Sequence, residues 1–131
     1  MNTKLDRILA EVSAGELIDK ITILEIKKVK ITDKDKLIEV EKELMSLNET
    51  MNESIPNLNR VAKYKKELKD VNLKLWDIEN GKRLAEKKND FGKNFIELSR
   101  SVYKSNDLRA KIKLEINNIL GSNIKEVKSH E

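Results

Sequence analysis

Several charged side chains in this sequence fall on helix faces that should be apolar. Residues 15–28 read GELIDKITILEIKK, a pattern with helical periodicity. On a helical wheel, Glu25 and Lys28 lie within the same broad arc as Ile21 and Leu24. Because burial of an ionised group is costly unless the group is paired or meets a ligand, these two charges indicate either an internal salt bridge or a binding site.

The same anomaly recurs in two later segments. Glu79 and Arg83 cluster around Trp76, away from the apolar seam of their predicted helix. Arg109 falls within the apolar arc of the last predicted helix, and Lys113 lies at the margin of that arc. Arginine and lysine bind anionic groups, while an aromatic ring stacks on a planar one. This combination is suited to a nucleotide or a sugar phosphate.

Two interpretations of these residues remain open. In the structural one, Glu25 pairs with Lys28, and Arg109 forms a bridge to Glu79. In the functional one, the polar groups line a shared pocket within the bundle or between subunits. The residues that this second interpretation assigns to the ligand are Glu25, Lys28, Trp76, Glu79, Arg83, Tyr103, Asn106, Arg109 and Lys113.

Local signals define the first elements that would position these side chains. Ser13 followed by Glu16 forms a capping box, which predicts a helix over residues 14–31. The acidic residue Asp33 supplies a new cap, which predicts a second helix over residues 33–52.

Apolar residues recur at heptad spacing in the predicted helix 33–52 and in the next one, 57–88. The two seams consist of Leu37, Val40, Leu44, Leu47 and Met51, and of Val61, Tyr64, Leu68, Val71, Leu75 and Ile78. The simplest arrangement is an antiparallel coiled-coil hairpin of these two helices. Pairing of the same seams between subunits is the alternative.

The remainder of the chain predicts two shorter helices. Asn89 and Asp90 can cap a helix over residues 91–104. The polar run 105–107, Ser-Asn-Asp, is typical of a helix stop followed by a new cap. A last helix over residues 107–120 is therefore expected.

Composition limits the classes of fold and function. A chain of 131 residues is expected to form a single domain over 1–131, here an all-α bundle of about five helices with a polar tail at 122–131. Charged residues make up 38% and aromatic residues 4% of the chain, which is typical of long helices with Lys/Glu-rich surfaces. The net charge of +4 is interspersed along these helices, so nucleic-acid binding is not favoured.

Missing residue types exclude further classes. The sequence has no cysteine, which excludes a disulfide scaffold and a thiolate zinc site. A single histidine, His130, cannot build a histidine metal site or a histidine-dependent triad. No apolar run approaches the roughly 20 residues of a membrane-spanning helix. The expectation is a cytoplasmic protein that contacts no membrane and carries no cofactor or metal.

An enzymatic role is the less favoured expectation. All-helical nucleotide pyrophosphohydrolases hold magnesium between carboxylates on neighbouring helices. Glu16 and Asp19 share one side of the first predicted helix, but on the wheel Asp19 lies on the polar side, well away from Glu25. The carboxylates therefore do not converge. A metal-free helical mutase that grips a dicarboxylate remains conceivable on the same arginine, lysine and glutamate residues.

Nearly the whole chain resembles an uncharacterised family of small bacterial and phage proteins, sometimes found beside or fused to glycosyltransferases. The matching segments are 12–27 (VSAGELIDKITILEIK), 75–79 (LWDIE), 95–103 (FIELSRSVY) and 106–107 (ND). One departure is Ala14, where a proline is common in the family. The resemblance implies that Arg100 joins the predicted ligand-binding set, within a family pattern of Glu16, Asp19, Lys20, Thr22, Glu25, Trp76, Glu79, Arg100, Tyr103, Asn106 and Arg109.

The leading functional hypothesis is a non-catalytic helical protein that binds an anionic nucleotide or a nucleotide-derived signal. In a phage, such a protein would sequester a host defence messenger, and a homo-oligomer is expected. The first alternative is a helical adaptor for a glycosyltransferase or another protein, acting through the heptad seams. The second is an all-α enzyme acting on a phosphorylated metabolite.

Overall fold

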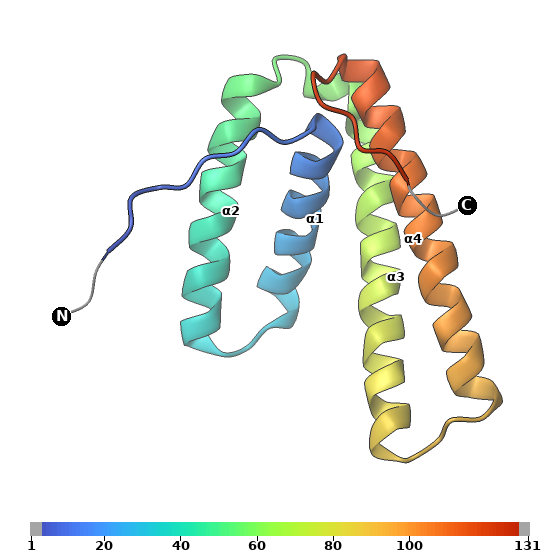
Figure 1. Ribbon diagram of the computed structural model, residues 1–131. Coiled ribbons are helices and arrows are strands. Elements are labelled where there is room, and N and C mark those ends of the chain that lie inside the picture. Colours follow the sequence, from blue (N-terminus) through green and yellow to red (C-terminus); the bar gives the residue numbers. More distant parts are fainter. Residues whose placement is uncertain (1–3, 129–131) are drawn as a thin grey trace.

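The computed structural model describes residues 4–128 of the chain, and within that range it contains helices and no strands. The elements are α1 (Ala14–Lys30), α2 (Lys34–Ser54), the short 3-10 helix η1 (Leu58–Val61), α3 (Ala62–Lys87) and α4 (Lys93–Leu120) (Figure 1). The all-α prediction is confirmed. None of the described helices is long and apolar enough to cross a membrane.

Side-chain caps set the beginnings of the first two helices. The Ser13 hydroxyl accepts a hydrogen bond from the Glu16 N–H at 3.1 Å, and the Asp33 carboxylate accepts one from the Lys36 N–H at 3.1 Å. Each bond satisfies an N–H group that has no partner within its own helix. The predicted start of α1 at residue 14 is confirmed. The Glu16 carboxylate, however, pairs with Lys113 of α4.

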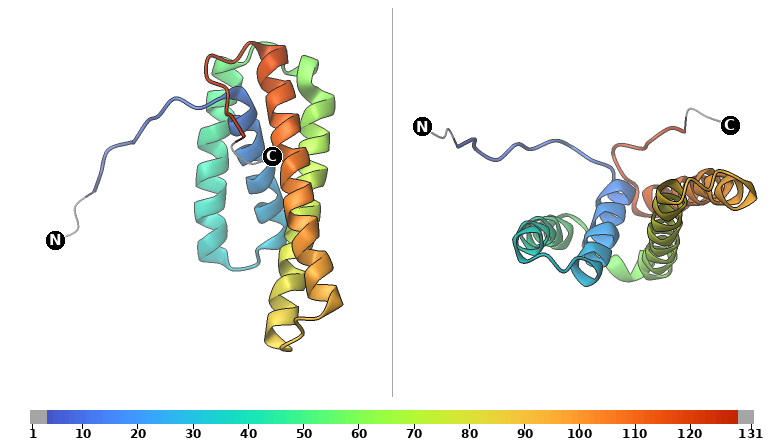
Figure 2. Two further views of the ribbon diagram at one scale, coloured as in Figure 1. Left: turned by 45° about the vertical axis from the view of Figure 1, so that its right-hand side comes forward. Right: turned by 90° about the horizontal axis from the view of Figure 1, so that it is seen from below.

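Helix α1 occupies the middle of the bundle. It packs against α2 on one side and against α3 and α4 on the other, and α3 and α4 form a hairpin that extends well past the end of α1 (Figures 1 and 2). The predicted coiled-coil hairpin of α2 and α3 is wrong, because α1 lies between them. A heptad seam shows that a helix has one narrow apolar stripe, and it does not show which helix covers that stripe.

The predicted number of five helices is also wrong, because α4 runs unbroken through residues 105–107. Ser105 is buried, whereas Asn106 and Asp107 are exposed on the outer face of the helix. Serine, asparagine and aspartate end a helix only where their side chains compete for backbone groups. Here the packing of α4 along α3 continues across the polar run and keeps the helix intact.

The apolar core joins all four long helices around α1. Ile18 and Ile21 of α1 are fully buried, and Leu68 of α3 and Ile116 of α4 pack in the same cluster. The apolar arc predicted for the first helix therefore holds over most of its length. It fails in the last turn, where Val29 is 79% exposed.

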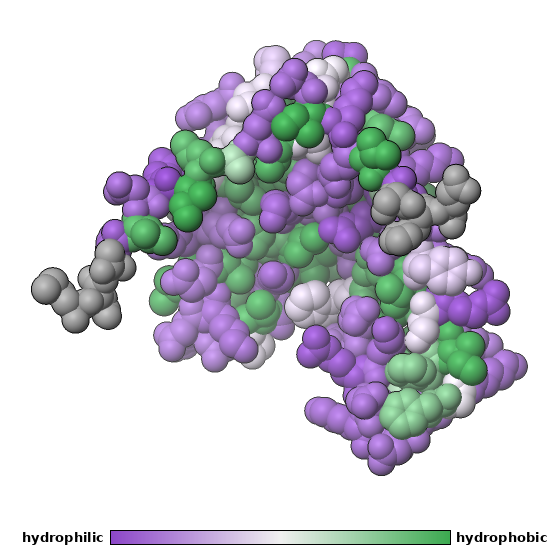
Figure 3. Space-filling model, viewed as in Figure 1, coloured by the Kyte–Doolittle hydropathy of each residue, from purple (hydrophilic) through white to green (hydrophobic). Residues whose placement is uncertain are grey.

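The far end of the α3–α4 hairpin carries exposed apolar side chains, which gather at the lower right of Figure 3. Leu84, Phe91 and Ile96 are each about half exposed, and the Phe91 ring meets Phe95 edge to face. Exposed apolar clusters of this kind are candidate association surfaces. The homo-oligomer expected from the sequence stays a prediction.

Candidate functional site

A carboxylate buried at the centre of the bundle organises the site. Asp19 of α1 is 0% exposed. The Arg109 Nε of α4 donates to Asp19 Oδ1 at 2.9 Å, and a terminal guanidinium nitrogen donates to Asp19 Oδ2. From α3, Asn72 Nδ2 donates to Asp19 Oδ1 at 2.9 Å. Three helices thus contribute to one polar centre.

Thr22 completes this centre on the α1 side. Its hydroxyl donates to the Asp19 carbonyl oxygen at 2.8 Å and accepts from Asn72 Nδ2 at 2.9 Å. A buried carboxylate is tolerated when a bidentate arginine and further donors replace its lost hydration. The hydrogen bond from Arg109 to Asp19 is the main cause that raises the pKa of the guanidinium, against the opposing effect of burial. Asp19, Thr22, Asn72 and Arg109 are called the buried centre below.

The buried centre forms part of the wall of an open groove of about 450 Å³ between α1, α3 and α4. Its lining consists of Ile23, Ile26, Asn72, Leu75, Trp76, Glu79, Asn80, Arg83 and Arg109. The bonds to Asp19 use Nε and one terminal nitrogen of Arg109, which leaves the other terminal nitrogen for a ligand. The groove therefore combines a fixed cation, a second arginine and an indole ring on an apolar floor.

The structure brings together four residues of the predicted site. Trp76, Glu79, Arg83 and Arg109 all line this groove. The predicted structural bridge between Arg109 and Glu79 is wrong, because Arg109 pairs with Asp19.

Glu25 and Lys28, where the sequence anomaly is clearest, lie elsewhere. The Glu25 carboxylate is 3.5 Å from Lys69 Nζ and 4.0 Å from Lys65 Nζ, both on α3. Lys28 is exposed and borders a separate hollow between α1 and α2, beside Glu41. The predicted pairing of Glu25 with Lys28 is therefore wrong, and neither side chain reaches the groove.

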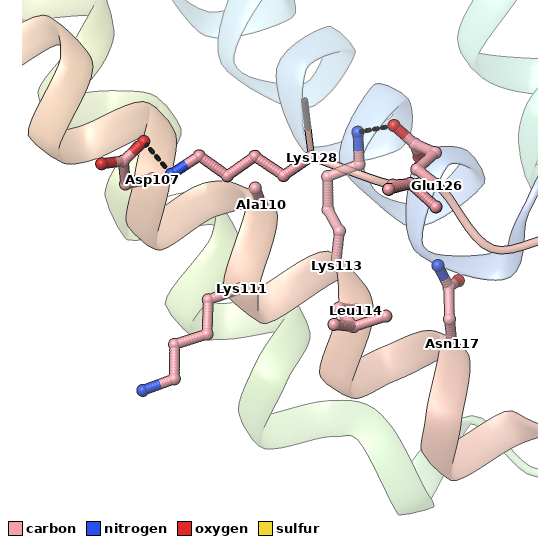
Figure 4. A pocket seen from close by; sticks show the side chains of 9 residues that line it. Asp107, Ala110, Lys111, Lys113, Leu114, Asn117, Glu126 and Lys128 are labelled. Carbon is pink, nitrogen blue, oxygen red and sulfur yellow. Dashed lines mark hydrogen bonds and ion pairs between the residues drawn. The ribbon is translucent and has the colours of Figure 1, made fainter. Parts of the chain in front are cut away.

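The remaining predicted residues on α4 also lie outside the groove lining. Arg100, Tyr103 and Asn106 are exposed on the helix surface. Lys113 faces a second cavity beneath the C-terminal residues (Figure 4). Successive turns of α4 thus present Arg109 and Lys113 to two different cavities.

Asp19 and Thr22 are the important residues that the helical-wheel argument missed. A wheel with one apolar arc places Asp19 on the polar side, which is correct for a helix that buries one face. Because α1 contacts α2, α3 and α4, it is buried around most of its circumference. The signal that did include both residues is the family pattern of the first helix.

Within residues 4–128, no group of three or more histidine, cysteine, aspartate or glutamate side chains is placed to hold a metal ion. His130 lies outside the described residues.

The fold and the groove together define a small all-α bundle in which a buried Asp–Arg pair stands beside an open, arginine-lined groove. The chain belongs to the family of unknown function DUF6165, whose model matches residues 8–131. This is consistent with the resemblance of nearly the whole sequence to an uncharacterised family. Comparison with curated proteins gives no match, and comparison with solved structures gives none either.

Proposed function

We propose that this protein binds a small anionic ligand, a nucleotide or a nucleotide-derived signal, in the groove between α1, α3 and α4, and does not convert it. The single observation that carries the proposal is the placement of Arg109. Its guanidinium is held by a fully buried carboxylate and reaches a groove that also contains Arg83 and Trp76. A cation positioned before the ligand arrives binds without the cost of ordering a flexible side chain.

The groove offers a distinct partner for each part of a nucleotide. Arg109 and Arg83 would bind phosphate oxygens, and the Trp76 indole would stack on the base. Glu79 and Asn80 would form hydrogen bonds with hydroxyl groups or the base edge. The volume of about 450 Å³ lies within the range of small-molecule sites, roughly 300–1,000 Å³.

Binding without conversion is supported by the chemistry of the groove lining. Among the lining residues, Glu79 is the one carboxylate, and no serine, threonine, cysteine, lysine or histidine stands beside it. Acid–base or nucleophilic catalysis commonly requires a pair of such groups in mutual contact. Sequestration of the ligand, as expected for a phage protein that removes a messenger, would need no such pair.

Thermal unfolding with a panel of linear and cyclic nucleotides tests this function. We expect at least one of them to raise Tm by several degrees at saturation, because a ligand that binds only the folded state stabilises it. Trp76→Ala and Arg83→Ala should abolish the shift, since both side chains line the groove. Arg100→Ala is the matched control, because Arg100 is exposed on α4 outside the groove lining.

Two results would contradict the proposal. One is the absence of any Tm shift across all phosphorylated compounds. The other is an equal shift in the Arg83→Ala and Arg100→Ala proteins. Chromatography of the ligand after incubation separates binding from catalysis, because a chemically changed ligand would favour the enzymatic alternative.

The heptad seams, which the adaptor alternative requires as a binding surface for a partner protein, are buried in the core. Leu44 and Leu68, central residues of the two seams, are 8% and 0% exposed within the core. Substitution of either residue would therefore destabilise the fold, whether or not a partner binds. A partner protein such as a glycosyltransferase would have to use another surface.

A further inference from the structure

The beginning of α1 is covered by residues from the other end of the chain. The Ala14 N–H donates to Ser122 Oγ at 3.0 Å, and the Gly15 N–H donates to Asn117 Oδ1 at 2.6 Å. Residues 121–128, called the C-terminal strap below, therefore lie across the first turn of α1 and along α4 (Figure 1). The N-terminus of a helix carries partial positive charge and favours anionic groups.

The strap places a carboxylate at this position. Glu126 Oε1 accepts from the Ser13 hydroxyl at 3.2 Å, and Glu126 Oε2 accepts from Lys113 Nζ at 3.0 Å. Lys113 also donates to Glu16 at 2.5 Å. Further along the strap, Lys128 pairs with Asp107 at 2.8 Å (Figure 4). Glu126 therefore occupies a site in which a hydroxyl and an ammonium converge at a helix N-terminus.

A cavity of about 360 Å³ lies under the strap beside this carboxylate. Ala110 and Leu114 of α4 and Val127 of the strap form its apolar wall. Asn117 lines the same cavity, is 1% exposed, and its Nδ2 has no hydrogen-bond partner among the described residues. A buried donor without an acceptor is costly, and such groups call for a ligand or an ordered water.

We propose that this cavity binds a phosphate monoester, whose phosphoryl group replaces the Glu126 carboxylate. The phosphoryl oxygens would accept from the Ser13 hydroxyl, from Lys113 Nζ and from the unpartnered Asn117 Nδ2. The organic group of the ester would lie against Ala110, Leu114 and Val127.

In this proposal, the Glu126 carboxylate occupies the position of the phosphoryl group when no ligand is bound, and it competes with the ligand for that position. The side chains of Ser122 and Lys128 attach the strap to α1 and to α4 on either side of Glu126. The Glu126 side chain can therefore turn away while the strap stays in place. Glu16 remains on Lys113 and keeps that ammonium oriented. This site is separate from the groove of the proposed function, and neither proposal depends on the other.

Isothermal titration of the full chain with inorganic phosphate and with phenyl phosphate tests the site. Glu126→Gln removes the competing charge, so we expect it to bind phenyl phosphate at least about tenfold more tightly than the unchanged protein. Inorganic phosphate should bind more weakly than phenyl phosphate, because it leaves the apolar wall uncovered. Glu97→Gln is the matched control, since Glu97 is an exposed glutamate that pairs only with Lys93 of its own helix among the described residues.

Two further measurements fix the location of the site. The side-chain amide signal of Asn117, which lines this cavity, should shift in an NMR titration with phenyl phosphate. Lys113→Gln in the Glu126→Gln background should abolish binding, with folding checked by circular dichroism. Equal affinity of the Glu126→Gln and Glu97→Gln proteins, or an unmoved Asn117 signal, would overturn the proposal. Equal affinity for the two probes would overturn the assignment of a monoester.

Discussion

Two polar clusters lie between α1 and α4, and they differ in what holds them together. The buried centre is built from α1, α3 and α4, and its carboxylate Asp19 is fully buried. The second cluster, at the start of α1, depends on Glu126 of the C-terminal strap, whose side chain is 48% exposed. One carboxylate is enclosed by three helices, whereas the other is half exposed and lies on a segment that follows the last helix.

The difference shows how similar ion pairs can serve opposite purposes. At the buried centre, Asp19 holds Arg109 in one orientation, and the cation is presented to the groove. At the start of α1, Lys113 is shared between Glu16 and Glu126, and one of these partners can leave without disturbing a helix. In the two proposals made above, the buried pair positions a binding group for a ligand, and the partly exposed pair is displaced by one.

The largest expected effect comes from Asp19→Asn. This change leaves Arg109 half buried without its counter-charge, and we expect the free energy of unfolding to fall by about 3–5 kcal/mol. Urea unfolding followed by circular dichroism measures it. Glu16→Gln, which removes a carboxylate from the partly exposed cluster, should cost only about 1 kcal/mol. A larger loss of unfolding free energy for Glu16→Gln than for Asp19→Asn would show that the cluster at the start of α1 stabilises the fold more than the buried centre does.

The second largest effect is expected from Gly15→Ala, which tests how closely α1 and α4 approach each other beside the strap. A Cβ at Gly15 would lie 2.5 Å from the Lys113 carbonyl oxygen, so Gly15→Ala must push the two helices apart. We expect a loss of about 1–3 kcal/mol despite the better helix propensity of alanine. Gly81→Ala is the control, because its Cβ would meet only the flexible Leu98 side chain, at 3.3 Å. If both substitutions have the same effect on Tm, the close approach at Gly15 is not a constraint.

The local parts of this structure could be predicted from the sequence. The cap at Ser13 and the beginning of α1 depend on neighbouring residues, and both predictions agree with the structure, in which α1 begins at Ala14. The pairing of helices depends on which stripes meet in three dimensions, and the equal heptad seams of α2 and α3 carry no information about the intervening α1. The unbroken α4 also depends on packing along α3, which overrides the local stop signal at residues 105–107.

The candidate site was predictable only in part. Trp76, Glu79 and Arg83 lie within two turns of one helix, so their clustering is a local property that a wheel can show. Arg109 was found because it interrupts an apolar arc. Asp19 could not be found in this way, because a central helix buries its polar side as well as its apolar one. The burial of a charged residue on the polar side of such a helix can be recognised only once the packing of the neighbouring helices is known.

Acid should weaken the cluster at the start of α1, in which Glu126 pairs with Lys113. Burial raises the pKa of Glu126, but the hydrogen bond and the positive charge of Lys113, together with the hydrogen bonds to Glu16 and Ser13, outweigh burial and leave the pKa below the usual value. The stabilisation from Glu126 is therefore present above the pKa of an unfolded glutamate, about 4.3, and is lost as pH falls through the lower folded value. Solvent screening limits it to about 0.5 kcal/mol. The fall in Tm between pH 6 and pH 3 should be smaller in Glu126→Gln, and identical pH profiles would show that Glu126 makes no contribution.

The smallest expected change in the free energy of unfolding is that of Glu25→Gln, although Glu25 is the clearest anomaly in the sequence. Glu25 lies 3.5 Å from Lys69 and 4.0 Å from Lys65, and all three side chains are partly exposed. Such pairs gain little because water screens them and long side chains lose conformational freedom. Glu25→Gln should therefore cost about 0.3 kcal/mol in urea unfolding, and the loss should vanish in high salt. A loss comparable to that of Asp19→Asn, or one insensitive to salt, would mean that the charge within the apolar arc of α1 is as important as the buried carboxylate on its opposite side.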